Sequence, residues 1–89
     1  MVDVLARVAN LEVNEVPDGY IVYQTELDRV HYLNRTAAIV FEFCEGQLDA
    51  NDIVSRVMQA FELEGTSDHE IRDCLDSLLK EGLIQSHSR

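Results

Sequence analysis

The sequence predicts a small α+β domain of winged-helix-like type, in which three strands precede three helices. Two observations lead to this prediction. Between residues 8 and 33 apolar side chains alternate with polar ones or gather in short β-branched and aromatic runs, whereas beyond residue 34 they recur every three to four positions. A chain of 89 residues also has room for only one hydrophobic core. We therefore expect a single domain over residues 1–89.

The first two predicted strands form a hairpin, and a third follows. Residues 8–16 alternate apolar and polar side chains, as a half-buried strand does. Pro17-Asp18-Gly19 interrupts the alternation, because proline sets φ for a turn and glycine can take a positive φ. Residues 20–24 are β-branched and aromatic, which favours a second strand. Residues 30–33 form a short third strand after a polar turn.

The first two predicted helices begin at polar caps. Asn34 can accept a free N–H of the first turn, and Gly46 supplies the left-handed stop of that helix. Asp49 is the cap of the second helix, whose apolar face includes Ile53, Val57 and Phe61. The polar residues 62–67 then form a loop.

The last predicted helix has a wide apolar stripe. Either Ser67 or Asp68 can cap it, and Gly82 ends it. We expect residues 83–84 to pack back on the sheet and residues 86–89 to fray. The stripe consists of Ile71, Cys74, Leu75, Leu78 and Leu79.

Composition argues against several classes of partner. The formal net charge is -10 at pH 7, which repels nucleic-acid phosphates and anionic membranes. No apolar run approaches the roughly 20 residues that a membrane helix needs. The first residues lack the basic and apolar regions of a signal peptide, so we expect a cytoplasmic protein with no nucleic-acid or membrane partner.

The side chains that carry chemistry are scattered. The sequence contains no glycine-rich phosphate loop and no paired-cysteine motif, and nothing places a histidine beside a nucleophile. Cys44 and Cys74 lie far apart in apolar contexts, where free thiols are typical of a cytosolic protein. We therefore expect no enzyme, no catalytic residue, no metal site and no cofactor.

Several of these segments, in this order and spacing, resemble the PqqD-like family. A strand ending in Leu-Asn leads into a helix of small residues that closes on an acidic residue and glycine, and a Gly-Leu-Ile ending follows a helix of spaced leucines. The resemblance spans about residues 8–84, although Asp49 stands where the family often has threonine. The segments that carry it are Leu33-Asn34, Thr36-Ala37-Ala38, Val40-Phe41-Glu42-Phe43-Cys44-Glu45-Gly46, Asp49, Ile53, Val57, Phe61, Leu75, Leu78 and Gly82-Leu83-Ile84.

The resemblance implies a fold and a function. PqqD-like proteins are the prototype of the RiPP recognition element, which captures the leaders of ribosomally synthesised and post-translationally modified peptides. The implied fold is a three-stranded antiparallel sheet against a three-helix bundle. The implied function is that of a non-catalytic peptide chaperone, which presents a precursor peptide to a modifying enzyme. In the family that enzyme is often a radical S-adenosylmethionine (SAM) protein, as in pyrroloquinoline quinone or related RiPP biosynthesis.

The same resemblance implies where a leader binds. It would add a strand beside residues 30–33, in a groove closed by the last helix. The last helix has more apolar positions than one core stripe needs, so we expect one flank of it to contact the leader and nearby charges to line the rim. Alternation along the third strand leaves open which of its faces lines the groove. The predicted peptide-binding residues are Val30, His31, Tyr32, Leu33, Asp68, Arg72, Leu75, Asp76 and Leu79.

Two other functions share this architecture. One is a winged-helix DNA-binding regulator, which the acidic charge and the two cations of the last helix, Arg72 and Lys80, disfavour. The other is a structural or dimerisation module. The sequence is compatible with either a monomer or a homodimer, because an exposed edge strand can pair with a partner or with a second copy.

Overall fold

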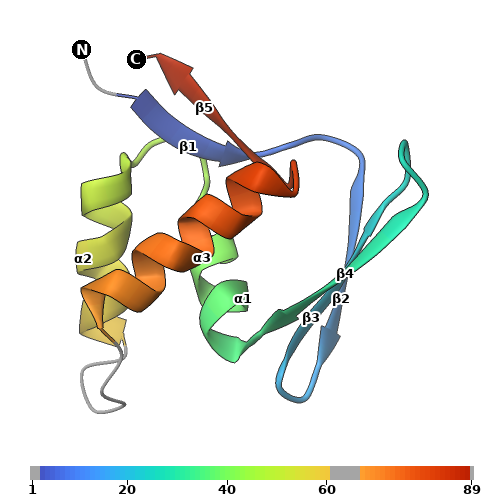
Figure 1. Cartoon of the computed structure of the whole chain (residues 1–89), viewed down its shortest axis with the longest axis horizontal. Coiled ribbons are helices and arrows are strands. Elements are labelled where there is room, and N and C mark those ends of the chain that lie inside the picture. The colour runs from blue at the N-terminus through green and yellow to red at the C-terminus, as the bar shows by residue number, and fades with distance from the viewer. Residues whose placement is uncertain (1–2, 61–66, 89) are drawn as a thin grey trace.

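A computed structural model describes residues 3–60 and 67–88 of the chain. Two small antiparallel sheets and three helices are arranged around one core (Figure 1). The elements are β1 (Asp3–Arg7), β2 (Leu11–Val16), β3 (Gly19–Gln24), β4 (Arg29–Asn34), α1 (Arg35–Glu42), α2 (Ala50–Ala60), α3 (Asp68–Lys80) and β5 (Ile84–Ser88).

The predicted three-stranded antiparallel sheet is confirmed. Its strand order is β2-β3-β4, and the register places Val13 opposite Val22 and Val22 opposite His31. The β2–β3 turn demands a glycine, because a Cβ at Gly19 would lie 1.9 Å from the backbone oxygen of Leu33. The third strand is longer than predicted, since β4 begins at Arg29 and ends at Asn34.

A second sheet was not predicted. β1 pairs with β5 from Asp3 opposite Ser88 to Arg7 opposite Ile84. The expectation that residues 86–89 fray is therefore wrong for residues 86–88. The first predicted strand, over residues 8–16, is also corrected, because β1 ends at Arg7 and a separate strand begins at Leu11. Because the two paired strands lie at opposite ends of the chain, no local sequence pattern indicates that they pair.

The polar caps act as predicted. Asn34 Oδ1 accepts from Ala37 N–H at 2.9 Å, Asp49 Oδ1 accepts from Asp52 N–H at 2.8 Å, and Ser67 Oγ accepts from Glu70 N–H at 3.2 Å. These bonds open α1, α2 and α3. The position of Phe61 and residues 62–66 of the loop predicted over residues 62–67 lie outside the described residues.

Gly46 has a different role from the predicted helix stop. α1 already ends at Glu42, and Gly46, with φ of 87°, lies beyond it. Its N–H donates to the Leu5 oxygen at 2.9 Å, next to a bridge between Ala6 and Glu45. The positive φ therefore turns the chain onto β1.

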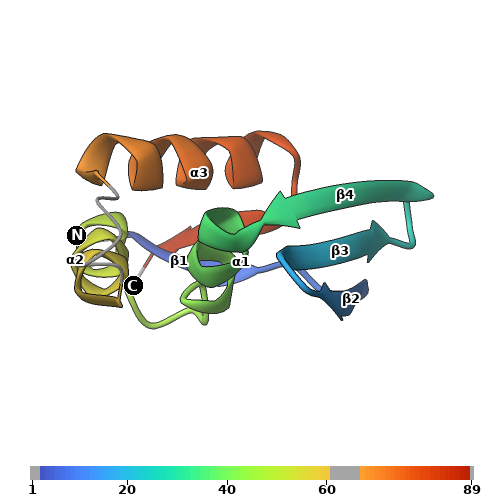
Figure 2. The ribbon, with the colours of Figure 1, turned by 90° about the horizontal axis from the view of Figure 1, so that it is seen from below.

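The core lies between the three helices and the β1–β5 sheet, and its largest fully buried side chains include Phe41, Ile53, Ile71 and Leu83. Val22 and Leu33 extend this core to the other sheet. β2 lies farthest from α3 (Figure 2), and Val13 is 43% exposed, so the expected half-burial of this strand is wrong. In the described part of the chain, no helix has the length and apolarity that crossing a membrane would require.

Candidate functional site

β4 forms an open edge of the three-stranded sheet. It pairs with β3 on one side, and among residues 3–60 and 67–88 no strand pairs with its other side. The C-terminal strand β5, which could have covered this edge, pairs with β1 instead. An unpaired edge offers backbone N–H and C=O groups to an extended chain.

A groove of about 550 Å³ runs beside this edge, between β4 and α3. α3 and β4 lie alongside each other and run in opposite directions (Figure 1), and Figure 2 shows α3 on the β4 side of the sheet. The residues that line the groove are Val30, His31, Tyr32, Leu33, Asn34, Ala37, Asp73, Cys74, Ser77, Leu78, Glu81 and Leu83.

All four residues predicted on the third strand line the groove, and burial separates their two faces. Leu33 is buried and His31 is half-buried, opposite the buried Val22, so this face turns toward the core. Val30 and Tyr32 are 65% and 53% exposed on the other face. Leu33 and His31 therefore belong to the floor of the groove, and Val30 and Tyr32 belong to its outer rim.

His31 connects the strand to the end of α3. The amide of the buried Gln24 donates from Nε2 to the Gly82 oxygen at 3.3 Å, so its Oε1 is the atom that accepts from His31 Nε2 at 3.0 Å. The other ring nitrogen, Nδ1, lies 3.6 Å from Glu81 Oε2. The two hydrogen bonds of Gln24 hold β3, β4 and the segment that follows α3 together at one end of the groove.

The α3 wall of the groove differs from the predicted one. Asp73, Ser77 and Glu81 are spaced four residues apart and form one line along the helix, with Cys74 and Leu78 beside them. Among the residues predicted on this helix, none lines the groove. Those residues are Asp68, Arg72, Leu75, Asp76 and Leu79.

The contacts of these residues explain the difference. Arg72 donates to Asp68 at 2.6 Å and to Asn51 of α2 at 2.9 Å, so this flank of α3 faces the second helix. Leu75 is buried in the core, and Leu79 is 38% exposed away from the groove. An apolar stripe does not reveal which of its two flanks a neighbouring helix covers. A peptide contact at these five positions stays a prediction.

The two cysteines have different surroundings. Cys44 is fully buried and donates from Sγ to the Val40 oxygen at 3.3 Å, and its burial raises the pKa of the thiol to about 12. Cys74 lies half-buried in the groove, where burial, followed by the charges of Asp73 and Glu70, raises its pKa. Both are thiols at neutral pH. Within the described ranges no cluster of three or more His, Cys, Asp or Glu residues could hold a metal.

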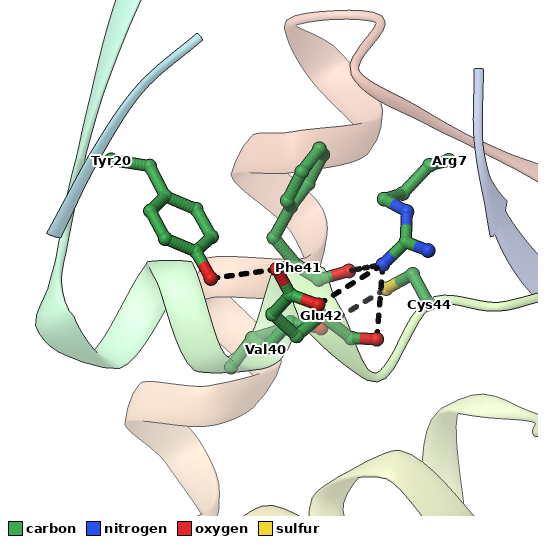
Figure 3. Close-up of polar contacts among 6 residues, drawn as sticks. All are labelled: Arg7, Tyr20, Val40, Phe41, Glu42 and Cys44. Carbon is green, nitrogen blue, oxygen red and sulfur yellow. Dashed lines mark hydrogen bonds and ion pairs between the residues drawn. The ribbon is translucent and has the colours of Figure 1, made fainter. Parts of the chain in front are cut away.

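A polar network supports the helix that follows β4 (Figure 3). Tyr20 Oη donates to Glu42 Oε1 at 2.6 Å, and this hydrogen bond, with a smaller effect of burial, raises the pKa of Tyr20 to about 12. Arg7 donates to the backbone oxygens of Phe41 and Glu42, pairs with the Glu42 carboxylate at 3.6 Å, and lies 5.6 Å from the Phe41 ring centroid. β1 and β3 thereby hold the C-terminal end of α1, whose Ala37 lines the groove.

Known proteins resemble this chain along most of its length. The family model described as coenzyme PQQ synthesis protein D (PqqD) matches residues 19–84. A PqqA binding protein of Methylococcus capsulatus is 27% identical over 81 residues, which cover 91% of this chain and 84% of that protein. The solved structure of TbiB1 in complex with the TbiA(beta) leader peptide superposes with a TM-score of 0.71 at 11% identity, over 94% of this chain and 99% of TbiB1. The last likeness shows a shared fold.

Proposed function

This chain belongs to the PqqD family, and from that premise we propose that it binds the leader of a ribosomally made precursor peptide. The leader adds a strand to the open edge of β4 and lies in the groove against α3. The observation that carries this proposal is the unpaired edge beside a groove that both elements line. The name of the Methylococcus relative and the leader peptide bound to TbiB1 support it.

The groove is needed as well as the edge. A micromolar complex corresponds to about -8 kcal/mol. A few strand hydrogen bonds, each with a net value of about 1 kcal/mol, supply only part of this. Apolar surface supplies the rest at about 25 cal/mol per Å² buried, and the exposed Val30 and Tyr32 and the half-buried Cys74 offer such surface in the groove.

We propose that the chain performs no chemistry on the peptide and presents it to a modifying enzyme. The favoured candidate for that enzyme is a radical SAM protein. The arrangement of its histidines supports a binding role. His31 contacts Gln24 and Glu81, and His69 contacts Asp73, so these partners are an amide and carboxylates rather than a thiol or hydroxyl that a histidine could activate. An acidic surface with net charge -10 suits a basic docking patch on the enzyme.

The structure adds no support for the DNA-binding alternative. α3 contains Asp68, Glu70, Asp73 and Asp76 against two cations, and Arg72 is held by Asp68 and Asn51. A recognition helix needs cations that are free to reach phosphates and bases. A dimerisation role stays a prediction, which light scattering at several concentrations tests.

Cys74 is a native reporter for the proposed site. We expect a synthetic PqqA peptide, or a short precursor encoded beside this gene, to slow maleimide labelling of Cys74 at pH 8 by at least tenfold. A glycine-serine peptide of equal length is the control for crowding, and Cys44 is the control for unfolding, because it is fully buried. A peptide that binds by calorimetry but leaves Cys74 labelling unchanged would place the binding site elsewhere.

A further inference from the structure

We propose that the groove selects leaders with two cationic side chains, four residues apart, on either side of an apolar one. This inference rests on the peptide-binding function proposed above and names the class of peptide. The first observation is the sign of charge along the α3 wall. Asp73 and Glu81 both line the groove, and no lysine or arginine is among the described residues that line it.

Within residues 3–60 and 67–88, neither carboxylate has a lysine or arginine as an ion-pair partner. The ion-pair partner of Asp73 is His69 at 3.3 Å, and that of Glu81 is His31 at 3.6 Å, and each ring is charged only if protonated. His31 donates from Nε2 to Gln24, so in the neutral ring the Nδ1 that faces Glu81 has no proton to donate. Both carboxylates therefore keep their attraction for a cation from a ligand.

The spacing of the two carboxylates matches an extended peptide. Glu81 is the C-cap of α3, eight positions after Asp73, and its helical backbone makes this separation about 12 Å at 1.5 Å per residue. In a strand, positions i and i+4 point to the same side and lie about 13 Å apart. Because α3 runs alongside β4 (Figure 1), a strand added to β4 would place such a pair opposite the two carboxylates.

The middle of the wall carries no charge. Cys74, Ser77 and Leu78 line the groove between the two carboxylates. The peptide residue at i+2 points to the same side as the two cations, so an apolar side chain there would meet this uncharged surface and contact the half-buried Cys74. Burial, and after it the charges of Asp73 and Glu70, raises the pKa of Cys74.

Selection from a random peptide library tests this inference. Nine-residue displayed peptides are selected on the folded chain, and groove binders are identified as those lost when Cys74 is blocked with a maleimide. We expect enrichment of Lys or Arg at positions four apart with an apolar residue midway. Groove binders without this pattern would overturn the inference and leave peptide binding in place. If every selected peptide still binds after Cys74 is blocked, the result would count against both the cation preference and peptide binding in the groove.

Charge variants test the assignment to the two carboxylates. We expect Glu81→Gln and Asp73→Asn each to weaken an enriched peptide about two- to fivefold, the range of an exposed ion pair. Glu12→Gln on β2 makes the same change in net charge outside the groove, and we expect no change in affinity. Glu81→Lys should favour a peptide with glutamate at the matching position. If Glu12→Gln weakened peptide binding as much as Glu81→Gln and Asp73→Asn do, the preference would depend on net charge alone, and the inference would be overturned.

Discussion

Ser77 and Leu79 lie two residues apart on α3 but belong to different surfaces. Ser77 lines the groove, whereas Leu79 points to solvent on another flank and is 38% exposed. The sequence pattern favours Leu79 as the ligand contact, because its side chain is apolar. The tertiary arrangement favours Ser77, because a small exposed residue at that position leaves space between α3 and β4.

A matched pair of substitutions decides between these two surfaces. Ser77→Trp fills the groove, so we expect it to weaken leader binding at least tenfold, while Leu79→Trp changes affinity less than twofold. Both positions are exposed on one helix, so equal melting temperatures by circular dichroism are the control. A larger loss of calorimetric affinity for Leu79→Trp would support the flank predicted from sequence instead.

Tyr20 makes the stability of the chain sensitive to alkaline pH. Its hydrogen bond to Glu42 requires the protonated phenol and raises its pKa from 10.0 to about 12. Because the pKa is higher in the folded than in the unfolded chain, the stabilisation is complete below pH 10 and is lost as pH rises toward 12.

We therefore expect Tyr20→Phe to lower the melting temperature at pH 8, and we expect this difference from the wild type to shrink steadily as pH rises from 10 toward 12. Thermal melts of both proteins between pH 8 and 11.5 measure it, and titration of the other groups cancels in the comparison. A constant difference across this range would contradict the role of the phenol proton.

At the scale of elements, the open flank of β4 is the feature on which the site depends. Alternation along a strand places every second residue of an added peptide in the same backbone orientation, so only alternate N–H groups face β4. The side chains of β4 determine the groove surface, whereas its backbone determines the register of a ligand.

Backbone N-methylation of a bound leader tests strand addition directly. We expect methylation at every second residue to weaken binding at least tenfold, because each removes a donor and crowds the edge, and methylation at the intervening residues to have little effect. The unmodified peptide is the control in the same calorimetric series. A uniform response along the peptide would indicate binding in a form other than a strand.

At the scale of the whole molecule, the two sheets have separate roles. The β1–β5 sheet closes the core through Val4, Leu5 and Ile84, and its residues take no part in lining the groove. The β2–β3–β4 sheet presents the edge. By pairing with β1, the C-terminal strand stabilises the fold and leaves the flank of β4 open.

Deletion of residues 86–89 separates these roles. It removes the partners of Asp3, Val4 and Leu5, so we expect the free energy of unfolding to fall by about 2 kcal/mol as Val4 and Leu5 become exposed. Urea unfolding measures the loss, and leader affinity well below the unfolding midpoint should stay within twofold of the full chain. An unchanged midpoint would show that these residues do not pair in solution.

Caps, helix faces and the three-strand hairpin pattern could be predicted from the sequence because their causes act over a few residues. Asn34, Asp49 and Ser67 each accept from an N–H three positions away. Alternation indicated a strand but overestimated the burial of β2, where Val13 is 43% exposed. The open edge of β4 and its four groove residues, Val30 to Leu33, were expected from the family resemblance rather than from a local pattern.

The folded chain alone decides which flank of α3 is open and where the C-terminal segment pairs. Both depend on partners that are distant in sequence, since Asn51 of α2 occupies one flank of α3 through Arg72 and Asp3 pairs with Ser88. Hydrophobic periodicity measures how much of a helix is apolar, but it does not identify the neighbour that covers each side. Because the groove wall of Asp73, Ser77 and Glu81 is polar, a search for apolar positions on α3 does not identify it.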